Sequence, residues 1–271
     1  MTFRILAKSA GLSIALILSG ATLASGNPGV EIKSGAVTVP VLELYTSEGC
    51  SSCPPAEKFL QQLMRESSAH HQVIPLAFHV DYWNYLGWQD PFSNAEYSRR
   101  QQRLARINHL RSVYTPQFVL HGSNFPAYRN LESAIKLIND DKPKANLQFR
   151  ASQRNANKLE TRTRVELSNR NNPANASLFL AVYENNLTRS IKAGENSGRT
   201  LRHEYVVRKL YGPHTLVSDG PSEISQDIDL DPEWKRQDLG IAVFVQNRQD
   251  GSTLQALDLP LDRLMQDYPA R

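Results

Sequence analysis

The sequence predicts a two-part protein, with an α/β domain over residues 37–142 followed by an all-β domain over residues 146–260. Apolar strand patterns alternate with helical patterns in the first part. Beyond Pro143 the pattern changes to about seven short strands, which are separated by Asn, Gly, Asp and Ser. We therefore expect a β-sandwich in the second part and a domain boundary near residues 142–146.

The first strand and helix of the α/β part have the clearest patterns. Residues 37–45 are β-branched and apolar, which is typical of a strand buried on both faces. Apolar residues recur at helical spacing over 54–68, and Pro54 and Pro55 suit the first turn of a helix. Residues 73–80 form a second apolar run, so this strand-helix-strand unit predicts a parallel pair with a right-handed crossover.

The rest of the chain predicts two more helices and several strands. Helical spacing recurs over 93–107 and 131–139. Pro116 stands at the entrance of an apolar strand, where its missing N–H does least harm, and a partner strand is expected at 125–128. In the second part, strands are expected near residues 147–151, 158–167, 177–183, 201–210, 222–230, 241–246 and 253–259.

The first 26 residues have the pattern of an export signal. Basic Arg4 and Lys8 precede an apolar stretch over 10–18 and a run of small residues. We expect a mature protein that is periplasmic or secreted and not membrane-bound; an uncleaved anchor is the alternative. The net charge of +4 is small for 271 residues, and the basic residues are dispersed along the chain. Both observations argue against a nucleic-acid partner or a polybasic membrane site.

The chain has two cysteines, Cys50 and Cys53, and they lie where the first strand pattern changes to the first helical pattern. A disulfide between residues three apart closes a very short loop, so it removes little chain entropy and gives little reason for a purely structural bond. Redox exchange or metal binding is the expected chemistry. In a periplasm, the pair is expected to rest as a disulfide.

Four sequence motifs resemble the DUF1223 family of secreted bacterial proteins. They are VLELYTSEGCSSCPPAE over 41–57, AFHVDYWNYLGW over 77–88, VYTPQ over 113–117 and GENSGRTL over 194–201. The order of elements over 37–142, with a dithiol at the first helix and a proline before the third strand, also resembles a thioredoxin fold. The resemblance implies a thioredoxin-like fold and names no reaction.

The thioredoxin likeness implies roles for four residues. Cys50 would be the solvent-facing nucleophile at the positive end of the helix, and the more buried Cys53 would resolve the mixed disulfide. A cis Thr115–Pro116 bond would leave the Thr115 backbone free to pair with an extended substrate, whereas an ordinary trans proline is the alternative. Ser51 and Ser52 replace the Gly-Pro of thioredoxins, so the direction of electron flow is not predicted.

An acidic residue near the cysteines departs from the thioredoxin pattern. Leu44 stands where thioredoxins carry a buried acid, and Glu43 precedes it on the opposite face of the strand. Glu43 could serve as a proton shuttle only if the strand is shifted or kinked, and a structural acid bonded to backbone amides is an equal alternative. Ser47 and Ser51 either donate hydrogen bonds to a Cys50 thiolate or cap backbone amides, and capping is favoured.

Aromatic residues follow the second strand. They would form a hydrophobic groove for peptide substrates, with Asp81 and Asp90 at its rim, or fill the core under a long connection. Packing is the favoured interpretation, with one or two rings exposed. The residues are Tyr82, Trp83, Tyr85 and Trp88.

These observations favour a thiol-disulfide oxidoreductase without a cofactor. It would act on protein or small-molecule disulfides or dithiols and exchange electrons with a redox partner protein. The first alternative is a metal-binding protein, in which Cys50 and Cys53 hold copper or zinc with His79 or another histidine. The second is an interaction module with a fixed disulfide, whose polar loop over 192–199 contacts a partner.

Overall fold

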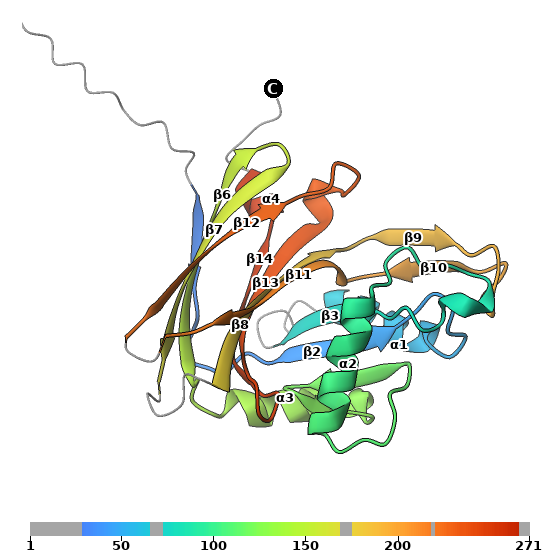
Figure 1. Ribbon diagram of the computed structural model, residues 1–271, viewed down its shortest axis with the longest axis horizontal. Coiled ribbons are helices and arrows are strands. Elements are labelled where there is room, and N and C mark those ends of the chain that lie inside the picture. Colours follow the sequence, from blue (N-terminus) through green and yellow to red (C-terminus); the bar gives the residue numbers. More distant parts are fainter. Residues whose placement is uncertain (1–28, 66–72, 169–174, 218–219, 266–271) are drawn as a thin grey trace, which may run out of the picture.

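The computed structural model describes residues 29–65, 73–168, 175–217 and 220–265, so the predicted export signal over 1–26 lies outside the described residues. This part of the chain has a mixed α/β fold with large β-sheets (Figure 1). One sheet has eight strands and another has four, and a two-stranded ribbon is separate from both.

The eight-stranded sheet contains the predicted strand-helix-strand unit. Strands β2 (Val41–Thr46) and β3 (Ile74–His79) are parallel and are joined through helix α1 (Pro54–Arg65), as predicted. The strand β4 (Gln117–Leu120) runs antiparallel to β2 and is followed by β5 (Ser123–Asn124). The other four strands are β8 (Ala176–Glu184), β11 (Val206–Thr215), β13 (Leu239–Asn247) and β14 (Thr253–Pro260), in the sheet order β14-β13-β8-β11-β3-β2-β4-β5.

Strand β11 joins the two parts of the chain into this one sheet. It runs parallel to β3 with Val206 opposite Ala77, and the Ala77 N–H donates to the Tyr205 carbonyl at 2.8 Å. Strands from both sides of the predicted boundary at 142–146 are therefore hydrogen-bonded neighbours. This pairing brings the chain that precedes β11 to the edge of the sheet where β2 and β3 end.

Helices cover the first core. Helix α2 (Ala95–Ile107) begins with the Asn94 side chain accepting from the Glu96 N–H at 2.8 Å, which caps its first turn. Helix α3 (Leu131–Asn139) follows the short turn η2 (Tyr128–Asn130). The central side chains of this core, all at most 2% exposed, include Leu42, Leu44, Tyr45, Phe78 and Phe118.

The four-stranded sheet encloses a second core. Its antiparallel order is β1 (Val30–Lys33), β6 (Ala145–Asn155), β7 (Lys158–Leu167) and β12 (Ser222–Asp229). Buried and exposed residues alternate along β6 and β7, because one face of each strand packs inward and the other faces solvent. The buried faces meet β8, β13 and β14 in one apolar cluster, and the short helix α4 (Asp262–Met265) follows β14.

Some strand boundaries differ from the prediction. The partner of β4 is β5 at 123–124 and not 125–128, because Gly122, at φ 81°, turns the chain directly after β4. A Cβ at Gly122 would lie 2.2 Å from the Gly251 carbonyl carbon, so this turn requires glycine. The predicted strand over 201–210 is two strands, β10 (Thr200–His203) and β11, separated at Tyr205 with φ 56°. Strand β1 was not predicted.

A further unpredicted strand, β9 (Leu187–Ser190), pairs with β10 in the two-stranded ribbon. The ribbon extends beside α1, at the right of Figure 1. Two other short turns, η1 (Asn84–Leu86) and η4 (Arg236–Asp238), complete the described elements. The position of the ribbon determines the site described below.

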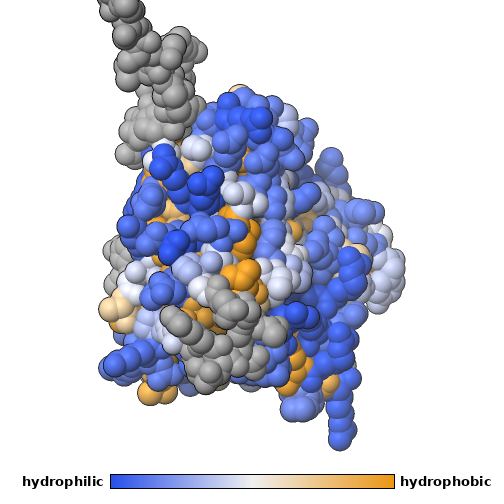
Figure 2. Space-filling model, turned by 60° about the vertical axis from the view of Figure 1, so that its left-hand side comes forward, coloured by the Kyte–Doolittle hydropathy of each residue, from blue (hydrophilic) through white to orange (hydrophobic). Residues whose placement is uncertain are grey.

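The outer surface of the four-stranded sheet is mostly hydrophilic, and hydrophobic residues form only small areas on this side of the molecule (Figure 2). Within the described ranges, no helix combines the length and apolar character that crossing a membrane requires.

Candidate functional site

The two cysteines form a disulfide at the start of α1. The Cys50–Cys53 bond has an S–S distance of 2.12 Å and a Cα–Cα distance of 5.4 Å. The Cys53 carbonyl accepts from the N–H groups of Ala56 at 2.9 Å and Glu57 at 3.2 Å, which makes Cys53 the residue at which the helix begins. The predicted position at a positive helix end is confirmed.

The expected exposure of Cys50 is wrong for this oxidised form. Cys50 and Cys53 are both 0% exposed, although Ser51 and Ser52 between them are exposed. The disulfide therefore lies just below a surface turn, under cover that comes from other parts of the chain.

The loop over 192–199, which joins β9 to β10, provides part of this cover. The Asn196 side-chain amide donates to the Glu48 carbonyl at 2.8 Å and to the Cys50 carbonyl at 3.0 Å, and Asn196 is itself 0% exposed. The Ser51 N–H donates to a Glu195 carboxylate oxygen at 3.1 Å. The loop that the interaction-module alternative assigned to a partner contact thus binds the cysteine turn of its own chain.

The serines around Cys50 act mainly on the backbone. The Ser47 Oγ accepts from the Gly49 N–H at 3.1 Å, in agreement with the capping interpretation. The hydroxyl beside the Cys50 sulfur belongs to Ser52, at 3.4 Å, and not to Ser51. Ser51 contributes its backbone to the contact with the loop over 192–199.

Trp83 connects the cysteine turn to the Thr115–Pro116 peptide, which is cis. The Trp83 Nε1–H donates to the Thr115 Oγ1 at 2.8 Å. A Cβ placed on Gly49 would lie 3.1 Å from the Trp83 Cβ, so the same side chain packs against the turn that precedes Cys50. Thr115, Pro116 and Trp83 are all half-buried.

The other aromatic residues are held by hydrogen bonds. The Tyr82 hydroxyl donates to Gln101 at 3.1 Å, and burial raises the pKa of Tyr82 to about 12. The Trp88 Nε1–H donates to Glu48 at 2.7 Å, whereas Tyr85 is 80% exposed. This arrangement fits the packing interpretation with one exposed ring.

Glu43 belongs to a closed group of buried side chains. Its carboxylate accepts from Arg100 Nε at 2.8 Å and Nη2 at 2.6 Å, and from the Tyr45 hydroxyl at 2.6 Å. Burial alone would lower the pKa of Arg100, but the Glu43 charge outweighs it and raises that pKa. Among the described contacts, none joins Glu43 to either cysteine. These bonds match a structural acid, although its partners are side chains and not backbone amides.

A second buried group lies next to the cysteine turn, and we call it the imidazole–carboxylate cluster. Its residues come from the cysteine turn, from α1, from the end of β3, from the chain after η1 and from the end of β10. The cluster combines two imidazoles with three carboxylates, and each residue is at most 5% exposed. Its members are Glu48, Glu57, His79, Asp90 and His203.

Hydrogen bonds connect the cluster in two pairs. The His203 Nδ1 is bonded to Glu57, which also accepts from the Thr46 hydroxyl at 2.7 Å. The His79 Nδ1 lies 2.7 Å from the Asp90 Oδ2. Asp90 is buried, so its expected position at the rim of a groove is wrong. The centroids of the two imidazole rings are 5.2 Å apart, and the His203 Nε2 is 3.3 Å from the Glu48 Oε1.

Charge determines the protonation of the Glu57–His203 pair. Burial alone would lower the pKa of His203, but the Glu57 and Glu48 carboxylates outweigh it and raise this pKa to about 10. Burial alone would raise the pKa of Glu57, but His203 outweighs it and lowers this pKa. The pair is therefore an imidazolium and a carboxylate near neutral pH.

The predicted metal site is not assembled as expected. The sulfurs of Cys50 and Cys53 are bonded to each other, so they are not available as thiolate ligands in this form. Among the described residues, the group whose atoms could hold a metal ion consists of Glu57, His79 and His203. Of these, His79 was named in the metal-binding alternative, which also allowed another histidine.

The sequence patterns did not single out four residues of this site, which are Glu48, Glu57, Asn196 and His203. The first three lie inside the motifs over 41–57 and 194–201, which was the available signal, and His203 lies two residues beyond the second motif. Their proximity depends on the β3–β11 pairing and on the ribbon, neither of which the sequence pattern revealed.

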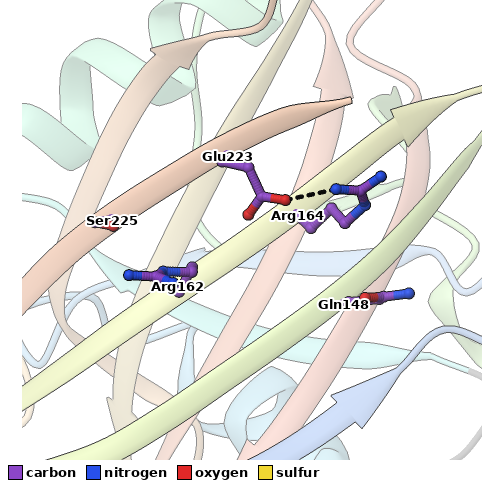
Figure 3. Close-up of a pocket in the computed structure, with 5 residues that line it drawn as sticks. All are labelled: Gln148, Arg162, Arg164, Glu223 and Ser225. Atoms are coloured by element: carbon purple, nitrogen blue, oxygen red, sulfur yellow. Dashed lines mark hydrogen bonds and ion pairs between the residues drawn. The ribbon is translucent and has the colours of Figure 1, made fainter. Parts of the chain in front are cut away.

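A surface hollow of about 720 Å³ lies elsewhere, on the outer face of the four-stranded sheet (Figure 3). The Arg164 guanidinium and the Glu223 carboxylate are paired across it at 2.7 Å. The hollow is polar and contains no residue of the cysteine turn or the cluster. Its lining residues are Gln148, Arg162, Arg164, Glu223 and Ser225.

Two solved structures share this fold. The X-ray structure of protein AGR_C_4864 from Agrobacterium tumefaciens is 23% identical, with a TM-score of 0.58, and the match covers 83% of this chain and 95% of that chain. HBP35 of Porphyromonas gingivalis is 16% identical, with a TM-score of 0.65, and the match covers 84% and 77% of the respective chains. At these identities the likeness concerns the fold alone.

The functionally curated proteins include no match to this chain. A family model described as "Protein of unknown function (DUF1223)" matches residues 41–246. This range contains the cysteine turn, the aromatic segment, the ribbon and every residue of the imidazole–carboxylate cluster. The chain therefore belongs to the DUF1223 family.

Proposed function

We propose that this protein is an exported, thioredoxin-like thiol-disulfide oxidoreductase. The Cys50–Cys53 disulfide at the start of α1 is the observation that carries this proposal. A bond between residues three apart stabilises the fold little, because the loop that it closes is short. A helix N-terminus favours a thiolate over a thiol, which gives the reduced pair a reactive sulfur.

In the reductive direction, the Cys50 thiolate attacks one sulfur of a substrate disulfide and releases the other substrate sulfur as a thiolate. The Cys53 thiolate then attacks the Cys50 sulfur, which closes the protein disulfide and releases the second substrate thiolate. Two electrons pass from the protein to the substrate. In the oxidative direction, the same steps run in reverse and the substrate dithiol is oxidised.

The cover over Cys50 indicates the kind of substrate. The loop over 192–199 must move from the cysteine turn before a sulfur atom can approach Cys50, because Asn196 and Glu195 are bonded to this turn. Thr115 and Pro116 would then present backbone to an extended substrate, beside Trp83. We infer that small disulfides and extended peptide segments are suitable substrates, and a redox partner protein would regenerate the pair.

Residues 37–142 are proposed as the thioredoxin-like domain and residues 146–260 as a β-sandwich, which supplies the ribbon that covers the site. Tyr82 and Trp88 are proposed to support the substrate surface through their bonds to Gln101 and Glu48. The disulfide and the predicted signal over 1–26 support a periplasmic or secreted location.

Equilibration of the purified protein with a series of glutathione or dithiothreitol redox buffers tests this function. The oxidoreductase should show one reversible two-electron transition, and the reduced protein should transfer its electrons to a peptide disulfide. Cys50→Ser should lose this transfer completely, while Ser51→Ala, an exposed neighbour, should retain it. A disulfide that resists excess dithiothreitol in the folded protein would instead identify an inert bond.

A further inference from the structure

The imidazole–carboxylate cluster contains three buried ligand atoms without hydrogen-bond partners. They are His79 Nε2, His203 Nε2 and Glu48 Oε1, and their side chains are at most 1% exposed. Buried polar atoms in native proteins are nearly always hydrogen-bonded, so an unpartnered one requires an explanation such as an ion. Here three such atoms occur in one cluster, and each belongs to a residue type that binds metals. Two of them, the His203 Nε2 and the Glu48 Oε1, lie 3.3 Å apart as an ion pair, whereas the His79 Nε2 has no such neighbour.

We propose that this cluster binds a divalent transition-metal cation through Glu57, His79 and His203. Each of these residues offers one ligand atom, and the three atoms lie within 4.8 Å of one another. Two ligand atoms on one zinc ion lie about 3.4 Å apart, because each bond is about 2.1 Å long and the angles are near tetrahedral. The Glu57 carboxylate is already bonded to the His203 Nδ1, so the ion would take the place of the proton between them, with the His79 Nε2 as the third ligand atom.

The orientation of His79 supports metal binding. Its Nδ1 is bonded to the Asp90 carboxylate at 2.7 Å, which leaves the unpartnered Nε2 as its ligand atom. A carboxylate on the second nitrogen is the usual support of a metal-bound histidine, since it orients the ring and increases its basicity. The Thr46 hydroxyl similarly holds Glu57 by a hydrogen bond of 2.7 Å.

The charges of the cluster also favour a cation. The carboxylates of Glu48, Glu57 and Asp90 are buried together, and the Arg189 Nε lies 3.6 Å from the Glu48 Oε1. A dication placed between His79, His203 and Glu57 would displace the proton of the His203 imidazolium and would then compensate these buried negative charges. The Glu48 Oε1 lies 3.3 Å from the His203 Nε2 and so faces the second nitrogen of that ring, as a carboxylate beside a metal-bound histidine usually does.

The ligand types indicate the class of metal. Two imidazoles and a carboxylate suit zinc and neighbouring first-row divalent ions, whereas calcium and magnesium prefer six or more oxygen ligands. The cysteine sulfurs are not required, because they are joined to each other in the oxidised protein. The ion would connect α1, β3 and β10, and would thus fix the ribbon to the helix that carries the cysteines.

Zinc titration of the oxidised protein tests this proposal. After treatment with a chelator, the protein with its disulfide closed should bind one Zn²⁺ per chain by calorimetry and elemental analysis, with no binding of Mg²⁺ or Ca²⁺. His79→Gln should weaken binding at least tenfold. His121→Gln, a matched histidine outside the cluster, should leave the affinity within twofold of the original. Cys50→Ser/Cys53→Ser should also bind one ion.

If His79→Gln does not fold, X-ray absorption spectroscopy at the zinc edge on the unmutated oxidised protein tests the same ligands. The expected first shell contains only nitrogen and oxygen, with two imidazoles. Sulfur scattering, absence of binding to the oxidised protein, or loss of binding in the cysteine variant alone would overturn the proposal. Because the cysteine variant removes redox exchange and keeps the metal ligands, failure of the proposed oxidoreductase function is distinguished from failure of this site.

Discussion

Two buried groups of charged side chains contact strand β2, and they differ in how completely their polar atoms are paired. In the group of Glu43, Tyr45 and Arg100, both carboxylate oxygens are bonded and the guanidinium donates to Glu43 through two nitrogens. In the imidazole–carboxylate cluster, the His79 Nε2 has no hydrogen-bond partner, and the His203 Nε2 and Glu48 Oε1 lie 3.3 Å apart as an ion pair without a hydrogen bond of good geometry. Both groups are buried, so burial of charge alone does not distinguish a structural group from a candidate site.

The difference follows from the chemistry of the partners. An arginine presents a planar fork that matches one carboxylate, so a single Glu–Arg pair satisfies both sides. The Arg100 guanidinium also lies over the rings of Phe78, Phe179 and Phe244, at 5.5, 5.1 and 5.5 Å from their centroids. The cluster instead has three carboxylates around two imidazoles. With this composition, some carboxylate oxygens and imidazole nitrogens are left without a hydrogen bond.

Replacement of Arg100 should have the largest effect. Arg100→Met leaves the Glu43 carboxylate buried without a cation, which should lower the free energy of unfolding by about 3–5 kcal/mol. Urea denaturation measures this loss. Arg103→Met, on the same helix but half-buried, is the matched control and should cost about 1 kcal/mol or less. Equal losses in the two variants would contradict the closed ion pair, and neither variant should change zinc affinity.

The second effect is a pH dependence of stability in the metal-free protein. Since the pKa of His203 is raised to about 10, its stabilising contribution is complete below about pH 6.5 and is lost as the pH rises towards 10. The expected decrease is of the order of a few kcal/mol, because one pKa unit corresponds to about 1.4 kcal/mol. Denaturation at a series of pH values, with a chelator present, measures it.

Removal of the imidazole tests the origin of this dependence. His203→Gln should flatten the profile of unfolding free energy between pH 6.5 and 10, whereas His214→Gln, outside the cluster, should leave it unchanged. The pKa values of Glu57 and Asp90 are lowered by His203 and His79 against the opposing effect of burial, so stability should also decrease below about pH 4. An unchanged alkaline profile in His203→Gln would remove His203 as the cause.

Weakening the cover of the disulfide should have a smaller effect on the free energy of unfolding than the changes above. Its larger effect should be on the rate at which the disulfide is reduced. Asn196→Ala removes two hydrogen bonds to the cysteine turn and should cost about 1–2 kcal/mol. Reduction of the disulfide by dithiothreitol should become about tenfold faster, since roughly 1.4 kcal/mol of restraint is lost. Stopped-flow tryptophan fluorescence follows the reaction. Ser197→Ala, in the same loop, should retain the original rate; acceleration in both variants would argue against a specific cover.

The last two variants each remove one hydroxyl that is bonded to a carboxylate of a buried group. Tyr45→Phe and Thr46→Val each remove a donor to a buried carboxylate, at Glu43 and Glu57, and should each cost about 1–2 kcal/mol. Only Thr46→Val should also weaken zinc binding, because Glu57 is a proposed ligand. Thermal denaturation and zinc calorimetry of both variants measure these changes, and identical zinc affinities would separate Glu57 from the metal site.

The local patterns predicted much of the secondary structure. Helix α1, the parallel β2–β3 pair and the alternating strand β7 at 158–167 follow from apolar periodicity and from proline at a helix start. The errors occurred at Gly122 and Tyr205, where a positive φ turns the chain within an otherwise continuous strand pattern. Ribbon strand β9 is four residues long, which is too short for a reliable periodic signal.

The sequence by itself determined where the dithiol lies, at the junction of a buried strand and a helix, since this depends on residues within one local segment. Only the tertiary structure decided that the dithiol is covered and that Glu57, His79 and His203 lie together. These contacts join residues up to 148 positions apart. The pairing of β11 with β3 and the ribbon before it create them, and no local pattern encodes such long-range pairing.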